Sequence, residues 1–235
     1  GHSENERVID ISADATVFSP TISGTCNKIR IHYGGQLGRM HDAASLVNSI
    51  KAFNGLETSG YVSFDFMISG AQSSVVQSEL ESEGISISNA IPSDEWRKYI
   101  DGFDIGLVSL LPGGATVCLP SKTYSMMAGG LAILAVCPLW SDLAKLILEN
   151  KVGWVVSNSP YINEYDLLGD DYLEKVQQKR AECDIVDEFV VVLKDIIENP
   201  DEIIQKRHRA RNCMLDKYGE GNLSREWEIA LGQLV

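Results

Sequence analysis

Short apolar segments alternate along most of this chain with longer segments that carry apolar residues at helical spacing. Apolar runs of about four to eight residues are typical of strands buried on both faces of a parallel sheet. Such runs predict strands at 28–33, 61–68, 85–88, 104–111, 131–136 and 153–156. The alternation over 28–156 therefore predicts an α/β fold with a doubly wound parallel sheet flanked by helices.

Helical spacing and capping residues predict where the connecting helices lie. The first two are expected at 43–53 and 72–83, and the third is expected to begin with Ser93 as its cap and to end near Gly102. Another should begin at Pro120, because proline suits the first helical turn. Extra C-terminal helices are expected at 185–198, from Pro200 onward and at 222–234.

The chain divides into four parts. Residues 1–26 are interpreted as an interdomain connection that begins with a possible tag scar, and residues 27–157 as the domain that contains the sheet. Residues 158–184 are polar and mixed, which indicates an insertion or loop. Residues 185–235 are expected to form helices that pack on the same domain.

Charge narrows the function classes. The chain has 20 Lys and Arg against 33 Asp and Glu, which gives a net charge of -13. A domain this acidic is not expected to bind nucleic acid or an anionic bilayer through a broad surface, although a local pocket can still hold a small anion. The basic run at 206–211 is expected to be a solvated helix face.

Cysteine and histidine spacing gives no sign of a disulfide framework or a metal site. No Cys-x-x-Cys pair occurs, so the cysteines are interpreted as reduced thiols of a cytoplasmic protein. They are Cys26, Cys118, Cys137, Cys183 and Cys213. The histidines, His2, His32, His41 and His208, have no metal-ligand spacing, and no apolar stretch reaches membrane-spanning length.

Two loops that follow predicted strands carry glycines and a cation. The loop at 34–39 ends in Arg39, and the loop at 112–120 leads into a helix start with Lys122. Ligands of such sheets bind beyond the carboxyl ends of the strands, and helix starts favour anions. A tight turn after the first strand and an ordinary crossover with a surface lysine explain the same residues equally well.

The order of these segments resembles the C-terminal, donor-binding half of a GT-B retaining glycosyltransferase. The group 1 (family 4) class, with many enzymes of polysaccharide and O-antigen biosynthesis, is the most similar. The strongest likeness is Pro-Ser-Lys-Thr-Tyr at 120–124 followed by Met-Ala-Gly-Gly at 127–130. The other segments that carry the resemblance are 14–20, 33–39, 66–70, 91–107 and 153–156.

The resemblance implies a Rossmann-like domain that binds a nucleotide-sugar, a UDP- or GDP-sugar, and needs no metal or other cofactor. Arg39 and Lys122 would act as catalytic residues, because cations aimed at the diphosphate stabilise the leaving group. The other implied donor-binding residues are Gly35, Gln36, Leu37, Gly38, Ala90, Ile91, Gly113, Gly114, Ala115, Thr116, Val117, Cys118, Ser121, Thr123 and Ser125.

The family also implies an N-terminal domain that holds a glycan or lipid-linked acceptor and that is missing here. The isolated domain is therefore expected to bind a donor but to transfer little or no sugar. Any peripheral contact with the inner membrane would come through that missing half.

Two positions depart from the family pattern. Most members carry two glutamates seven residues apart, and the corresponding positions here are Val117 and Ser125. A serine gives up a charge-assisted hydrogen bond to the ribose, so weaker donor affinity is expected. A catalytically inactive nucleotide-sugar-binding or regulatory module paired with another subunit is the alternative that this departure leaves open.

Other sheet-containing classes fit less well. A dehydrogenase or an epimerase half is disfavoured because no G-x-G-x-x-G opens the first helix and the second strand ends in Ser69-Gly70 without an acid. A receiver-like signalling domain is disfavoured because no acidic cluster follows the first strand.

Overall fold

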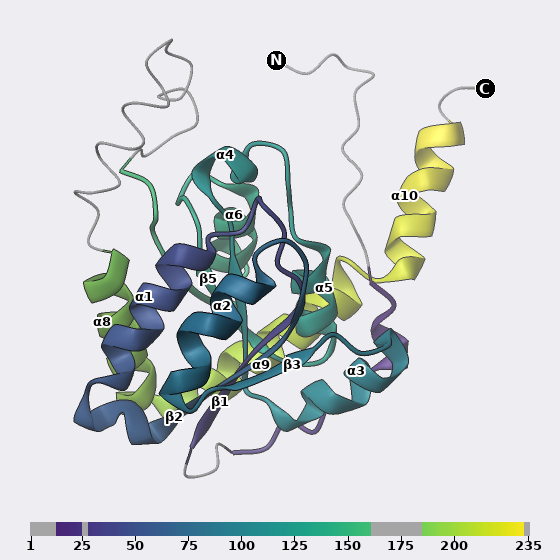
Figure 1. Ribbon diagram of the computed structural model, residues 1–235. Coiled ribbons are helices and arrows are strands. Elements are labelled where there is room, and N and C mark those ends of the chain that lie inside the picture. The colour runs from purple at the N-terminus through teal and green to yellow at the C-terminus, as the bar shows by residue number, and fades with distance from the viewer. Residues whose placement is uncertain (1–12, 25–27, 161–184, 233–235) are drawn as a thin grey trace.

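The computed structural model describes residues 13–24, 28–160 and 185–232 (Figure 1). Within them, six parallel strands form one sheet in the order β3-β2-β1-β4-β5-β6. The strands are β1 (Ile29–Gln36), β2 (Val62–Ser69), β3 (Ser86–Asn89), β4 (Ile105–Ser109), β5 (Ala132–Val136) and β6 (Gly153–Val156). The predicted fold class, a doubly wound parallel sheet, is therefore confirmed.

Helices cover both faces of the sheet (Figure 1). One face packs against α1 (Ala43–Asn54), α2 (Ser73–Leu80) and α8 (Ile185–Glu198). The other packs against α3 (Ser93–Tyr99), α5 (Ser121–Ala128), α6 (Asp142–Glu149) and α9 (Pro200–Asp216). Neighbouring side chains of β5 point to opposite faces of the sheet, as the period of two in a strand requires. Leu134 packs in the core on the side of α1, and Ile133 packs in the core on the side of α5.

Two further helices lie outside these layers. The one-turn helix α4 (Pro112–Ala115) lies beyond the end of β4, and α10 (Glu220–Gly232) extends away from the sheet in Figure 1. Within the described ranges, no helix combines the length and apolar character needed to cross a membrane.

The sheet opens between β1 and β4. The two strands pair only at Ile31 with Ile105 and at His32 with Gly106, whereas β1 continues to pair with β2 as far as Gln36. The order in which strands are added to the sheet also changes here. β2 and β3 are added on one side of β1, and β4 is added on the other side. This topological switch point is where a doubly wound sheet forms its crevice.

Several predicted boundaries are wrong. β1 runs to Gln36, so the first two glycines of the predicted loop belong to the strand. The predicted loop at 112–120 contains α4, and α5 begins at Ser121 with Pro120 as its N-cap. Ser93 is the first residue of α3 rather than its cap, because Pro92 holds that position and no side chain caps the helix.

The basic run at 206–211 is not the solvated face that the sequence predicts. Arg207 is 2% exposed, and its guanidinium reaches Asp104 Oδ1 at 3.1 Å and donates to the Gly130 carbonyl oxygen at 2.8 Å. Arg211 donates to backbone carbonyl oxygens of Ala15 and Phe18. These arginines bind α9 to the sheet and to the N-terminal segment, and the spacing of basic residues along the helix does not reveal these contacts.

The remaining predictions concern segments at the edges of the described ranges. Cys118, Cys137 and Cys213 are free thiols, as expected, whereas Cys26 and Cys183 lie outside the described residues. Most of the predicted connection at 1–26 and of the insertion at 158–184 also lies outside them. The described segment 13–24 lies against the turn that follows α3 and against α9, since the backbone N–H of Thr21 donates to Asp101 and Arg211 donates to the carbonyl oxygen of Ala15.

Replacing Arg207 with methionine is expected to lower the free energy of unfolding by about 3 kcal/mol. The change leaves the carboxylate of Asp104, itself 2% exposed, without its main buried partner. Arg209→Met is the matched control, because Arg209 is an exposed residue of the same helix and its loss should cost no more than about 0.5 kcal/mol. Urea denaturation of the two variants measures the difference, and equal costs would contradict the inward role of Arg207.

Candidate functional site

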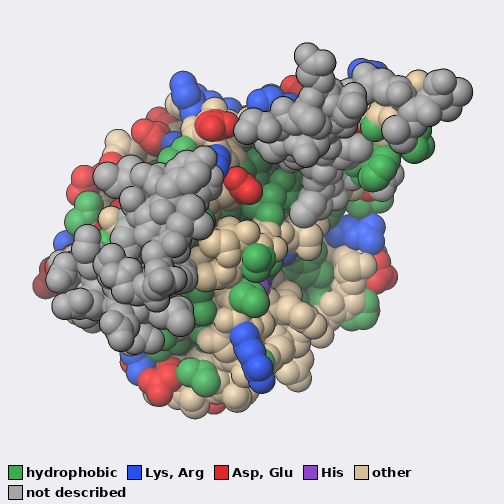
Figure 2. All heavy atoms as spheres, turned by 90° about the horizontal axis from the view of Figure 1, so that it is seen from above, with side chains coloured by type: hydrophobic (Ala, Val, Ile, Leu, Met, Phe, Trp, Pro, Cys, Tyr) green, Lys and Arg blue, Asp and Glu red, His purple; other side chains and the backbone are tan. Residues whose placement is uncertain are grey.

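A cavity of about 490 Å³ opens at the carboxyl ends of β1, β2 and β3, beside the start of α5. We call it the carboxyl-edge pocket. It is lined by Gly34, Gly35, Gln36, Met67, Ala90, Ile91, Ser93, Trp96, Ser121, Lys122 and Ser125. Figure 2 looks down on this side of the molecule, whose middle is formed mainly by hydrophobic and uncharged atoms.

The backbone of β1 provides the floor of this pocket. Gly35 has a φ of 92°, a left-handed conformation that glycine adopts without strain. Because β4 no longer pairs with this part of β1, the last residues of the strand face the start of α5 instead. The split in the sheet therefore creates the space that the pocket occupies.

Lys122 reaches from α5 across this split to β1. Its Nζ donates to the hydroxyl of Tyr33 at 2.8 Å and to the carbonyl oxygen of Gln36 at 3.0 Å. The same ammonium lies 4.0 Å from the centroid of the Tyr33 ring, within the range of a cation–π contact. Of the two interpretations that the sequence leaves open for Lys122, an ordinary surface lysine does not fit these contacts.

Burial changes the protonation of Lys122. Loss of solvent lowers the pKa of Lys122 to about 7, against a smaller opposing effect of Cys118. Burial likewise raises the pKa of Tyr33 above its ordinary value, and a hydrogen bond with Ser109 opposes this shift. The pocket therefore holds a lysine that gains or loses its proton near neutral pH.

A buried polar cluster supports this corner of the sheet from behind. His41 Nδ1 donates to the carbonyl oxygen of Ser109 at 2.7 Å, and the amide of Asn158 donates to Asp42 Oδ2 at 2.8 Å. Burial, and then the charge of Lys122, lower the pKa of His41 to about 4, so that it is neutral at physiological pH. These side chains fix the ends of β1 and β4 and place no second cation beside Lys122.

The amides at the start of α5 are only partly available to a ligand. Thr123 is one of the implied donor-binding residues, but its N–H donates to the carbonyl oxygen of Pro120 at 3.0 Å and is therefore not free for an anion. The side chain of Thr123 is also fully buried. This leaves the amides of Ser121 and Lys122 as candidates for anion contact at the helix start.

The structure brings together seven of the residues that the sequence predicts for the site. Gly35, Gln36, Ala90, Ile91, Ser121, Lys122 and Ser125 all line the carboxyl-edge pocket. The remaining predicted residues lie outside its lining: Leu37, Gly38, Arg39, Gly113, Gly114, Ala115, Thr116, Val117, Cys118 and Thr123.

Arg39 lies beyond the lining of the pocket, and the next residue, Met40, contacts the α4 segment. The backbone N–H of Leu111 donates to the carbonyl oxygen of Met40, and a Cβ on Gly114 would lie 2.7 Å from that same oxygen. Arg39 is exposed and has no hydrogen bond or ion pair with any other described residue. Val117 is 75% exposed.

Four lining residues escape the sequence analysis: Gly34, Met67, Ser93 and Trp96. One local feature could have pointed to Trp96. It lies near the start of α3, just after the loop at the carboxyl end of β3, and is therefore close to the carboxyl edge of the sheet. Its contact with β1, however, joins residues 64 positions apart, which no local pattern shows.

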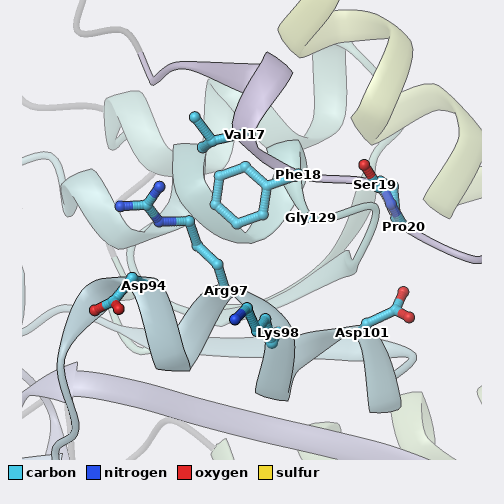
Figure 3. Close-up of a pocket in the computed structure, with 9 residues that line it drawn as sticks. All are labelled: Val17, Phe18, Ser19, Pro20, Asp94, Arg97, Lys98, Asp101 and Gly129. Carbon is cyan, nitrogen blue, oxygen red and sulfur yellow. The ribbon is translucent and has the colours of Figure 1, made fainter.

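A second cavity, of about 430 Å³, lies between the N-terminal segment and α3. Figure 3 shows Arg97 extending toward Val17 and Phe18, while the carboxylate of Asp94 is turned away from them. Arg97 donates to the carbonyl oxygen of Ser93, and none of the site residues predicted from the sequence lines this cavity. The carboxyl-edge pocket is therefore the candidate functional site.

Comparison with known proteins identifies the fold. No protein-family model matches the sequence, and no curated protein matches it. Among solved structures, the C-terminal domain of a group 1 glycosyl transferase from Francisella tularensis has a TM-score of 0.57 at 14% identity, over 88% of this chain and 98% of that domain. Sucrose-phosphate synthase from Thermosynechococcus elongatus has a TM-score of 0.67 at 9% identity, over 97% of this chain.

A third similar structure is TarM from S. aureus, in a complex that contains UDP, with a TM-score of 0.57 at 12% identity over 91% of this chain. The protein thus has the fold of the C-terminal domain of a GT-B glycosyltransferase. It spans 52% of the sucrose-phosphate synthase chain and 38% of the TarM chain.

Lys122→Met is expected to stabilise the unliganded protein by about 1–2 kcal/mol below pH 7, because methionine replaces a desolvated ammonium. The folded-state pKa of Lys122, about 7, lies below the unfolded value of roughly 10.4. The unfolded chain therefore binds more protons between these two values, and the stability of the unchanged protein rises with pH across that window. The advantage of the methionine variant should accordingly shrink above pH 7 and reverse before pH 10.

Urea denaturation at pH 6 and at pH 9.5 measures this trend. Lys145→Met is the control, because Lys145 is half exposed and pairs across one helical turn with the exposed Asp142. A difference between Lys122→Met and the unchanged protein that does not vary with pH would contradict the low pKa of Lys122.

Proposed function

We propose that this protein is the donor-binding domain of a retaining, metal-independent glycosyltransferase of polysaccharide biosynthesis. Its donor is a nucleotide-sugar, and its acceptor is a glycan or a lipid-linked glycan held by another domain. The observation that carries the proposal is the single ammonium of Lys122, held by Tyr33 and Gln36 at the carboxyl edge of the sheet. The shared fold and the UDP in the TarM complex support it.

The chemical character of the carboxyl-edge pocket fits a nucleoside diphosphate. Met67, Ile91 and Trp96 make one part of the lining apolar, which suits a planar base. Ser121 and Lys122, at the start of α5, offer hydroxyl, amide and ammonium donors, which suit phosphate oxygens. The lining contains no Asp or Glu among the described residues, so a ligand anion meets no like charge there.

The reaction requires a stabilised leaving group. The bond between the anomeric carbon and the β-phosphate oxygen breaks with its electron pair on that oxygen. The acceptor hydroxyl forms the new bond to the anomeric carbon and gives its proton to the departing phosphate oxygen. Lys122 contributes by stabilising the charge that grows on the diphosphate. Arg39, exposed and unpaired three residues beyond Gln36, is proposed to approach the same diphosphate from the opposite side of the loop.

The remaining predicted contacts follow from this placement. Ser125, one turn after Lys122 on α5, is proposed to meet the ribose, and the backbone at Ala90 and Ile91 the base. The segment from Gly113 to Cys118 is proposed to lie along the sugar, since it adjoins the loop that carries Arg39.

A second candidate function is binding without transfer, as a regulatory module. The presence of Ser125 in the pocket lining favours it, because a serine makes a weaker bond to ribose hydroxyls than a carboxylate does. Release of nucleotide from a bound donor, followed after addition of candidate acceptors and partner subunits, distinguishes the two functions.

Calorimetric titration with UDP-, GDP-, TDP- and ADP-sugars is expected to reveal weak binding of at least one donor. Lys122→Ala should lower that affinity tenfold or more, since hydrogen bonds to charged groups contribute about 1.5–3 kcal/mol. Lys145→Ala, on the exposed face of α6, should leave the affinity unchanged. The absence of a response to every donor would refute the proposal.

Donor binding at pH 8 is expected to take up about one proton per nucleotide. Lys122 has a pKa of about 7 in the free protein, and a diphosphate beside it favours the charged form, so that binding raises its pKa. The pKa of His41, about 4, keeps that side chain out of this exchange. Calorimetry in buffers of different ionisation enthalpy measures the uptake, and an equal uptake by Lys122→Met would contradict the assignment to this lysine.

A further inference from the structure

The apolar side of the carboxyl-edge pocket depends on a buried chain of hydrogen bonds. The indole Nε1 of Trp96 donates to His32 Nε2 at 2.9 Å, and His32 Nδ1 lies 2.7 Å from Asp65 Oδ1. The hydroxyl of Tyr99 donates to the other carboxylate oxygen of Asp65 at 2.9 Å. The chain thus joins α3 to β1 and β2, directly behind the wall of the pocket.

The chemistry of the partners fixes the direction of each bond. An indole N–H can only donate, so His32 Nε2 must accept and must carry no proton. The proton of the neutral imidazole therefore lies on Nδ1, which donates to the carboxylate of Asp65. His32 is 0% exposed and Asp65 is 6% exposed, so water does not compete for these bonds.

The same geometry decides which part of Trp96 a ligand meets. Its N–H points toward the fully buried His32 and is already used. Trp96 lines the pocket, and because its one polar group is bound to His32, the part of the indole that is left for a ligand consists of carbon atoms. The pocket thus gains a flat, polarisable surface without a free hydrogen-bond donor.

Gly34 allows this placement. A Cβ at Gly34 would lie 2.5 Å from the indole Nε1 of Trp96 and 2.6 Å from His32 Nε2. Any side chain at this position would therefore push the indole away from β1. The hydrogen bond with His32 holds the indole of Trp96 against β1, and the absence of a side chain at Gly34 leaves the space that this position needs.

We infer that Trp96 is a specificity-determining residue of the carboxyl-edge pocket, whose indole receives the planar base of the donor nucleotide, and that His32 and Asp65 are its positioning residues. The inference rests on the proposed function, because it assumes that a nucleotide enters this pocket. An aromatic side chain that stacks on a base discriminates between a nucleoside diphosphate and a diphosphate alone. Lys122, by contrast, interacts with the phosphates that both ligands share.

The test compares UDP with inorganic pyrophosphate as ligands. Trp96→Leu is expected to weaken UDP binding about tenfold or more while pyrophosphate binding changes less than about twofold. Trp96→Phe, which keeps a ring but loses the bond to His32, should weaken UDP binding by a smaller factor. Trp227→Phe on α10 is the control, because Trp227 is 51% exposed and does not line the pocket.

Two further measurements separate positioning from simple structural support. Binding of UDP should quench tryptophan emission in the unchanged protein and in Trp227→Phe, but not in Trp96→Phe. His32→Leu should weaken UDP binding as Trp96→Phe does and should add nothing in the double variant, because both remove the same hydrogen bond. If His32→Leu does not fold, Trp96→Phe removes that bond from its other end and decides the question alone.

The outcomes distinguish this inference from the proposed function. Unchanged UDP binding by Trp96→Leu, or an equal loss of UDP and pyrophosphate binding, would overturn the role of Trp96 and leave the donor pocket intact. Failure of the unchanged protein to bind UDP or any other nucleoside diphosphate would overturn the proposed function itself.

Discussion

A desolvated lysine at the edge of the sheet is the interaction on which the site depends. Within the part of the chain that the structure describes, Lys122 contacts a tyrosine hydroxyl, a carbonyl oxygen and an aromatic ring, and none of these neutralises its charge. Burial therefore lowers its pKa to about 7. The same burial makes an ammonium more effective toward an incoming anion, since low polarity strengthens electrostatic attraction and the group needs no rearrangement. Stability and anion binding thus place opposite demands on one side chain.

The parallel sheet makes this position possible. β1 keeps its pairing with β2 up to Gln36 but loses β4 after His32. Backbone groups on the open side of β1 would otherwise face the next strand, and here the carbonyl oxygen of Gln36 accepts from Lys122 instead. The polar cluster of His41, Ser109 and Asn158 closes the split from behind. A strand end, a helix start and a buried polar cluster therefore meet at this split in the sheet.

The sequence predicts the fold far better than the site. Apolar runs such as 131–136 and 153–156 are local signals, and the strands lie there. Lys122 was also found locally, because a cation near a helix start after a strand is a short-range pattern. The partners of Arg207, Asp104 and Gly130, and the contact of Trp96 with His32, are long-range, and periodicity cannot distinguish a buried arginine from a solvated one. The predicted end of β1 is wrong because Gly34 and Gly35 continue the strand, whereas glycines after an apolar run usually indicate a turn.

The serine at position 125 also affects the charge environment of Lys122. It lies three residues after Lys122 on α5, a spacing that places the two side chains on neighbouring points of the helix surface. A glutamate there would be able to pair with the ammonium and would raise the pKa of Lys122 by its negative charge. Serine cannot do so, and no carboxylate is among the groups that shift the pKa of Lys122. Serine at this position therefore leaves Lys122 without a carboxylate partner on α5, so that the ammonium is not already paired with an Asp or Glu of that helix when a ligand phosphate arrives.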